Sequence, residues 1–134
     1  MRRRGVIRRL GGLCLLLWLS GCVTTPPGPE SRELTLAAEA DRVLHAGLAV
    51  LVAQGYVIRH GDAELRRLEA ERGDWPGYRL RLTVTEAGTE AGTDIEREAA
   101  SRITLLGWRG GRPLAPLALD PLLVAIQAEL GLLP

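Results

Sequence analysis

The most regular pattern in this sequence is the alternation of apolar and polar residues across positions 78–85. Successive side chains of a β-strand point to opposite faces of a sheet, so this alternation predicts a strand with one buried face, formed by Tyr78, Leu80, Leu82 and Val84. Such a strand needs neighbouring strands for its backbone hydrogen bonds and an apolar layer over its buried face. The rest of the chain must supply both.

Two segments have the helical spacing of apolar residues that would cover such a sheet. The first is expected to begin at Ser31 or Thr35 and to end near Gln54, where a glycine follows. The second is expected to begin at Asp120, which would act as the N-cap before a proline, and to end at Gly131. The pattern therefore predicts one helix near each end of the folded part.

Further strands are predicted on both sides of the alternating segment. Residues 56–59 are rich in β-forming side chains and should be followed by a turn at 60–62. Residues 63–72 suit either a short helix or a half-exposed strand, and the turn-forming residues 73–77 that follow favour the strand. Residues 102–108 form another predicted strand. The expected fold is α+β: an N-terminal helix, three to four mostly antiparallel strands and a C-terminal helix packed on one sheet face.

The N-terminal segment has the organisation of a signal peptide. Five arginines among the first nine residues precede an apolar run from about Leu10 to Leu19, which is shorter than the roughly 20 residues of a membrane-spanning helix. The run ends in Leu19-Ser20-Gly21-Cys22, which resembles the lipobox of bacterial lipoproteins. The resemblance implies cleavage between Gly21 and Cys22, a diacylglycerol on the Cys22 thiol and acylation of the new amine.

The residues after Cys22 indicate the location that this resemblance implies. In the lipoprotein family an Asp directly after the lipidated Cys tends to keep the protein in the inner membrane, whereas here Val23 and Thr24 follow. An outer-membrane anchor with the folded part in the periplasm is therefore expected. The expected organisation is a signal peptide at 1–21, a lipidated Cys with a Pro-rich tether at 22–32, and one small α+β domain at 33–134.

Processing would change the charge and the cysteine content of the chain. The sequence has 17 arginines and 16 acidic residues, and loss of residues 1–21 would leave twelve arginines against sixteen acids, a formal charge of −4. This balance argues against nucleic acid or an anionic membrane surface as a partner recognised through charge. Cys14 would leave with the signal peptide and Cys22 would be lipidated, so no thiol would remain for a disulfide, a metal or a nucleophile.

Candidate catalytic or metal-binding groups are sparse after residue 22. His60, Asp62 and Glu64 offer one imidazole and two carboxylates close together in the sequence, but further ligands or a nucleophile are missing from this segment. We interpret these residues as a solvated turn. His45 follows Asp41 by one helical turn and is interpreted as part of a solvated helix face. We therefore expect no metal, no cofactor and no enzymatic activity.

The aromatic residues offer one candidate contact. Tyr56, Trp75, Tyr78 and Trp108 remain after processing, and the predicted strands direct Tyr78 and Trp108 toward the core. Trp75 lies at a predicted hairpin tip, where it would either fold over its own hairpin, which is the favoured alternative, or act as an exposed anchor for a partner. The sequence thus predicts a non-enzymatic accessory or scaffold lipoprotein of the cell envelope, with Trp75 as the candidate contact with a protein partner. The alternative is a periplasmic module that binds a small ligand or peptidoglycan.

Overall fold

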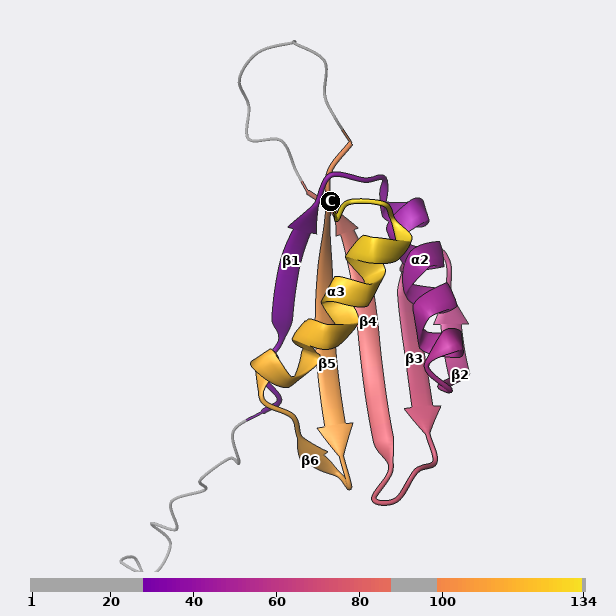
Figure 1. Ribbon diagram of the computed structural model, residues 1–134, viewed down its shortest axis with the longest axis vertical. Helices are drawn as coiled ribbons and strands as arrows, with labels where there is room; N and C mark the ends of the chain where they lie inside the picture. Colours follow the sequence, from indigo (N-terminus) through magenta and orange to yellow (C-terminus); the bar gives the residue numbers. More distant parts are fainter. Residues whose placement is uncertain (1–27, 88–98, 134) are drawn as a thin grey trace, which may run out of the picture.

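The computed structural model describes residues 28–87 and 99–133, which form an antiparallel sheet with two helices (Figure 1). The elements follow in the order β1 (Arg32–Leu36), α2 (Ala40–Ala53), β2 (Val57–Asp62), β3 (Arg67–Arg72), β4 (Tyr78–Glu86), β5 (Ser101–Arg109), β6 (Arg112–Pro113), the 3-10 helix η1 (Pro116–Leu119) and α3 (Asp120–Glu129). The predicted α+β class is confirmed.

The alternating segment forms β4, which lies inside the sheet. The strand order is β1-β5-β4-β3-β2, every neighbouring pair is antiparallel, and β6 pairs with the end of β5. Leu82 lies opposite Leu68 on β3 and Leu105 on β5, so apolar residues of neighbouring strands share one face. The sheet has six strands rather than the predicted three to four.

Both helices cover the same face of the sheet, and the core lies between the two layers (Figure 1). Leu82, Ile103 and Leu105 are fully buried there, and Leu51 of α2 and Ile126 of α3 pack into the same core. Burying a side chain of this size stabilises the fold by about 1.5–3 kcal/mol. The opposite sheet face, from β1 to β2, has no helix on it among the described residues.

A glycine sets how closely α2 approaches the sheet. A Cβ atom on Gly47 would lie 2.7 Å from Cδ1 of Leu82, closer than carbon atoms of real side chains come. The missing side chain lets the helix rest directly on β4.

The N-terminal helix begins later than predicted, because residues 32–36 form a strand. β1 pairs with β5 and places Arg32 opposite Leu105, while Leu36 faces the core. Leu36 and Ala40 are four residues apart, which is the spacing of one helical turn. The apolar pattern alone therefore predicted a helix that began at Ser31 or Thr35. Pairing with the free edge of β5 satisfies backbone groups that a longer helix would leave unpaired on that edge.

Three further boundaries differ from the sequence-based expectation. Residues 60–62, predicted as a turn, belong to β2, and the turn occupies 63–66 before β3 begins. The strand interpretation of 63–72 is thereby confirmed for its second part. Asp120 is not an N-cap: it is the first residue of α3, and its Oδ1 accepts a hydrogen bond from Nε of Arg32 at 2.6 Å.

No helix within residues 28–87 and 99–133 is long and apolar enough to cross a membrane. The predicted lipobox, Leu19-Ser20-Gly21-Cys22, lies outside the described residues, as does most of the predicted tether.

Candidate functional site

The three residues singled out as a weak metal or acid–base candidate do not form a site. Asp62 Oδ1 accepts a hydrogen bond from the backbone N–H of Leu65 at 2.8 Å and so closes the turn after β2. His60 lies in β2 opposite Glu69 on the uncovered sheet face. Within the part of the chain that the structure describes, no group of three His, Cys, Asp or Glu side chains is placed to hold a metal ion.

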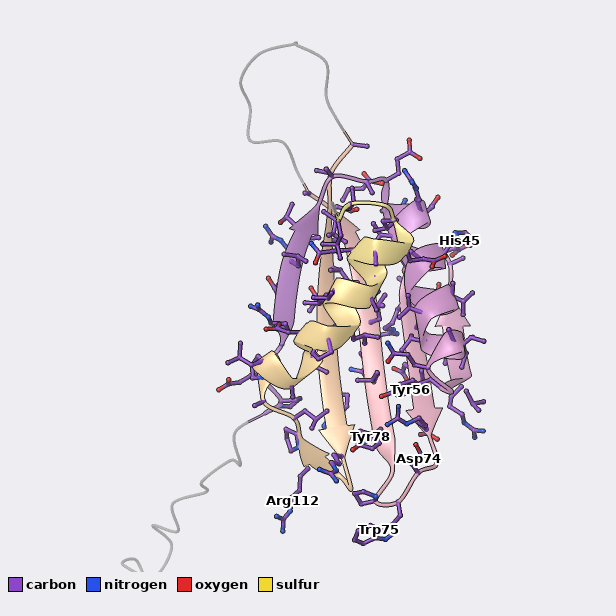
Figure 2. All side chains as sticks on the ribbon, viewed as in Figure 1. His45, Tyr56, Asp74, Trp75, Tyr78 and Arg112 are labelled. Atoms are coloured by element: carbon purple, nitrogen blue, oxygen red, sulfur yellow. The ribbon has the colours of Figure 1, made fainter. Side chains whose placement is uncertain are left out.

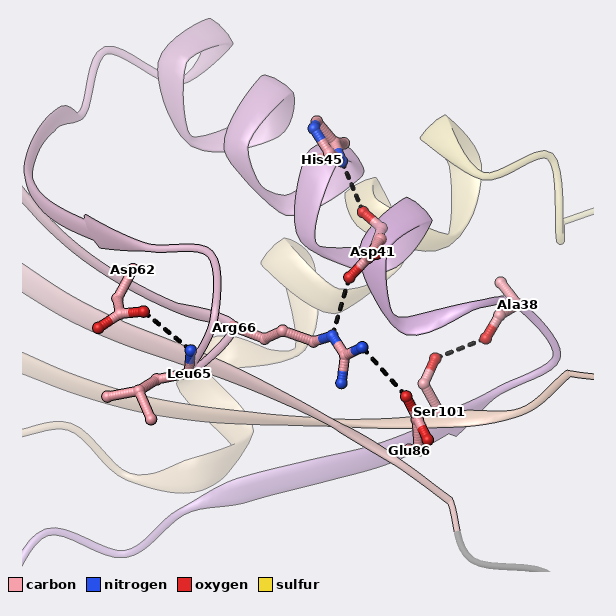
Figure 3. A network of polar contacts seen from close by, with 8 residues as sticks. All are labelled: Ala38, Asp41, His45, Asp62, Leu65, Arg66, Glu86 and Ser101. Atoms are coloured by element: carbon pink, nitrogen blue, oxygen red, sulfur yellow. Dashed lines mark hydrogen bonds and ion pairs between the residues drawn. The ribbon is translucent and has the colours of Figure 1, made fainter.

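A polar network joins α2 to the end of the sheet beyond β4 (Figure 3). Arg66, in the turn between β2 and β3, donates from Nε to Asp41 at 2.8 Å, and its Nη2 lies 3.0 Å from Oε1 of Glu86. The hydrogen bond to Asp41 raises the pKa of the Arg66 guanidinium, so this group stays charged. Nδ1 of His45 lies 2.7 Å from the backbone carbonyl oxygen of Asp41. The network connects helix, turn and strand in a solvent-exposed position.

We call this end of the sheet the loop end: it comprises the turn 63–66, the start of α2, the end of β4, the start of β5 and the end of α3 (Figure 1). Its charged residues are mainly acidic. Six carboxylates face four guanidinium groups here: Glu39, Asp41, Asp62, Glu64, Glu86 and Glu129 against Arg42, Arg66, Arg67 and Arg102.

The opposite end, which we call the hairpin end, comprises residues 56–59, 71–79 and 108–113. All four aromatic side chains of the described residues lie there: Tyr56, Trp75, Tyr78 and Trp108. The guanidinium carbon of Arg72 lies 5.0 Å from the ring centre of Tyr56 and 4.7 Å from that of Tyr78. This cation is therefore held between two rings, with its Nε 2.9 Å from Asp74 Oδ2.

Burial raises the pKa of the Tyr56 phenol, and the nearby positive charge of Arg72 opposes this shift in part. The phenol is therefore neutral under ordinary conditions, and the cation faces an uncharged aromatic ring.

Trp108 lies on the uncovered sheet face, not in the core as predicted. Gly107 takes the core-facing position, where a Cβ atom would lie 2.9 Å from Cδ2 of Leu119, the last residue of η1. Strand alternation then directs Trp108 to the other face, where it lies opposite Arg79 and is partly buried. The guanidinium carbon of Arg79 covers its ring at 5.1 Å.

Trp75 points away from the molecule at the tip of the β3–β4 turn (Figure 2). Its side chain is 93% exposed, so the favoured expectation that it folds over its own hairpin is wrong. The turn itself is braced: Gly110 N–H donates to the carbonyl of Gly77 at 2.8 Å, and a Cβ atom on Gly110 would lie 3.2 Å from Cβ of Pro76. The exposed ring is therefore held on a supported turn.

The hairpin end is basic. Five arginines lie there with two acids, Glu71 and Asp74, which pair with Arg59 at 3.7 Å and Arg72 at 2.9 Å. The other three arginines, Arg79, Arg109 and Arg112, have no carboxylate within 4.0 Å among residues 28–87 and 99–133, and all three are exposed. Arg112 projects from the same end as the indole ring of Trp75 (Figure 2).

An open hollow of about 520 Å³ lies between the two turns of the hairpin end. It is lined by apolar, aromatic and basic side chains, among them Arg59, Tyr78, Arg79 and Trp108, and by one carboxylate, Glu71. A surface of this composition could receive a flat or anionic group, because guanidinium groups bind anions and the rings provide contact area.

The described part of the chain enters the sheet from the hairpin-end side. β1 is antiparallel to β5 and places Arg32 opposite Leu105, in the middle of β5, from where β1 runs toward the loop end (Figure 1).

Comparison with known proteins adds no functional assignment, since the chain matches no protein-family model and no curated protein.

Proposed function

We propose that this chain is a lipid-anchored lipoprotein of the cell envelope, held in the outer membrane by Cys22 with its domain in the periplasm, and that it acts as a non-enzymatic accessory or scaffold protein. The lipobox-like Leu19-Ser20-Gly21-Cys22 supports the anchor. On this proposal, residues 1–21 are removed and residues 22–32 link the lipid to the domain.

The observation that most supports action by contact is the position of Trp75. Its ring is 93% exposed on a braced turn and contributes almost nothing to the core. A large apolar side chain in such a position is typical of contact residues, because the ring loses little freedom when it is buried against a partner. The proposed role of the domain is therefore to present this end to another surface.

Lipid labelling in cells tests the anchor. Wild-type protein should incorporate a palmitate analogue, and Cys22→Ala should lose the label because it lacks the thiol. Cys14→Ala is the matched control, since it removes the other cysteine of the sequence but leaves the lipobox-like pattern intact. Labelling of Cys22→Ala at the wild-type level would contradict the anchor.

The membrane assignment has its own test. Val23→Asp should shift the protein toward the inner-membrane fraction of a sucrose gradient, whereas Val23→Ala should leave it in the outer-membrane fraction. Wild-type protein found mainly with the inner membrane would contradict the assignment.

A second candidate function is supported by the hollow of about 520 Å³ at the hairpin end. Its aromatic and arginine side chains would suit a periplasmic module that binds a small anionic ligand or a peptidoglycan fragment. Saturable binding of such a fragment, lost in Arg79→Ala, would favour this function over that of a scaffold.

A further inference from the structure

We propose that the hairpin end of the domain rests on the anionic phospholipid surface of the membrane in which the chain is anchored, with the ring of Trp75 among the lipid headgroups. The inference rests on the proposed lipid anchor and names the surface that Trp75 contacts. Three independent features of the hairpin end support it: where the chain enters the fold, the exposed aromatic tip and the local charge.

Chain length limits how far the hairpin end can lie from the anchor. Six residue steps separate Cys22 from Gly28, where the described chain begins. Even a fully extended segment spans no more than about 3.6 Å per residue, so Gly28 would lie within about 22 Å of Cys22. Because β1 runs from beside the middle of β5 toward the loop end, the anchored segment reaches the sheet from the hairpin-end side, which allows the hairpin end to face the bilayer (Figure 1).

The side chains that project from this end suit a membrane interface. Tryptophan is enriched at the level of lipid headgroups, where its ring contacts apolar chains and its N–H meets polar groups. Trp75 and Arg112 project from the same end of the molecule (Figure 2). Arg109 is the last residue of β5 and lies beside the turn that leads to Arg112. Arginines next to an anionic bilayer each strengthen binding by about fivefold.

The acidic balance of the mature chain does not oppose this contact, because most of the acids lie elsewhere and the two at this end, Glu71 and Asp74, pair with Arg59 and Arg72. β4 has nine residues and extends from the hairpin end to the loop end, a distance of about 30 Å at about 3.4 Å per residue. At physiological ionic strength charges are screened beyond about 8 Å. The carboxylates of the loop end therefore have little effect on a bilayer that faces Arg109 and Arg112.

Tryptophan quenching in vesicles tests the orientation. Mature lipidated protein is reconstituted into vesicles of phosphatidylcholine and phosphatidylglycerol, with and without bromine atoms on the acyl chains. Loss of the signal peptide removes Trp18, so Trp108→Phe leaves Trp75 as the only tryptophan, and Trp75→Phe leaves Trp108. We expect brominated lipid to reduce Trp75 emission, because its indole lies at the interface, and to leave Trp108 emission almost unchanged.

Removal of two arginines tests whether docking of the hairpin end depends on its positive charge. In the Trp108→Phe background, Arg109→Gln with Arg112→Gln should weaken docking by about 25-fold, fivefold for each arginine, and reduce the quenching of Trp75. The matched control is Arg42→Gln with Arg102→Gln, which removes the same charge from the loop end and should leave the quenching unchanged. Circular dichroism of each variant confirms that the fold is retained.

The outcomes separate this inference from the proposed anchor. If the wild type carries no palmitate label, the proposed lipid anchor is wrong, and the vesicle experiment is not needed to show it. With label present, equal quenching of the two tryptophans, or quenching of Trp75 that survives loss of Arg109 and Arg112, overturns the docking. A photo-crosslinking residue at position 75 that couples to a protein rather than to phospholipid in whole cells also overturns it.

Discussion

The two ends of the sheet use the same residue type in different ways. At the loop end, Arg66 binds two exposed carboxylates, Asp41 and Glu86, in contact with water. At the hairpin end, Arg72 is about as buried as Arg66, 28% against 30% exposed, but it lies between the rings of Tyr56 and Tyr78 in addition to pairing with Asp74. The first arginine neutralises an acidic surface, while the second holds together an aromatic cluster that other arginines surround. The ends therefore differ in polarity although they terminate the same strands.

The composition of the whole chain does not reveal this difference, because the antiparallel direction of the strands decides which residues meet at each end. Strands β3, β4 and β5 each contribute one terminus to each end, so the sequence must alternate between acidic and basic segments to build two unlike ends.

The largest effect is expected from the core that both ends share. Leu82→Ala should destabilise the mature protein by about 2–5 kcal/mol, because it leaves a cavity beneath Gly47. Thermal unfolding followed by circular dichroism should show one transition, lowered by about 4–8 °C for each kcal/mol. Thr83→Ala, the next residue on the uncovered face, is the control and should change little. Two separate transitions would show that the ends fold independently.

A smaller effect is expected where the two arginines are compared. Arg72→Ala should cost about 1–2 kcal/mol, since it removes two cation–π contacts, and 1 M salt should leave most of this difference. Arg66→Ala should cost less, and its effect should vanish in high salt because exposed ion pairs are screened. Chemical denaturation with urea at low and high salt measures both. Equal salt dependence of the two variants would remove the distinction.

The two tryptophans of the hairpin end should separate contact from stability. Trp75→Ala should change the free energy of unfolding by less than about 0.5 kcal/mol, because the ring is 93% exposed. Trp108→Ala should cost about 1 kcal/mol, because its ring is partly buried under Arg79. Urea denaturation of both variants provides the comparison. A Trp75→Ala variant as destabilised as Trp108→Ala would mean that the exposed ring supports the fold.

The smallest effect is a loss of stability in alkaline solution that originates at the hairpin end. The pKa of Tyr56 is raised above its ordinary value of 10.0 by burial, so folding favours the neutral phenol. This stabilisation is complete below about pH 10 and is lost as the pH rises through the pKa of the folded state. Tyr56→Phe should unfold with a weaker pH dependence above pH 10. An unchanged alkaline profile in this variant would assign the loss to other groups.

Strands β4 and β5 and the class of the fold could be predicted because each depends on local patterns. The alternation in β4 and the β-forming residues of β5 specify strands without reference to the rest of the chain. β1 could not be predicted, since the spacing of Leu36 and Ala40 fits a helix equally well and only pairing with β5 decides between them. Trp108 was misplaced because Gly107 occupies the core-facing position that a larger residue usually takes.

The candidate site was predicted only in part. Trp75 was identified from its turn, but its direction depends on how Pro76 packs against Gly110, a residue that is distant in the sequence. The basic character of the hairpin end was hidden in a whole-chain charge that is acidic after residue 21. It appears only when the antiparallel order brings residues 59, 72, 79, 109 and 112 to one end.

The most direct test of the account measures which end faces the bilayer. Spin labels are attached to Trp75→Cys at the hairpin end and to Glu64→Cys at the loop end of lipidated protein, whose only native cysteine after processing would be blocked by lipid. Electron paramagnetic resonance then compares collisions with oxygen, which concentrates in lipid, and with a water-soluble nickel complex. We expect position 75 to favour oxygen and position 64 to favour nickel. Equal exposure of both positions to nickel would contradict the account.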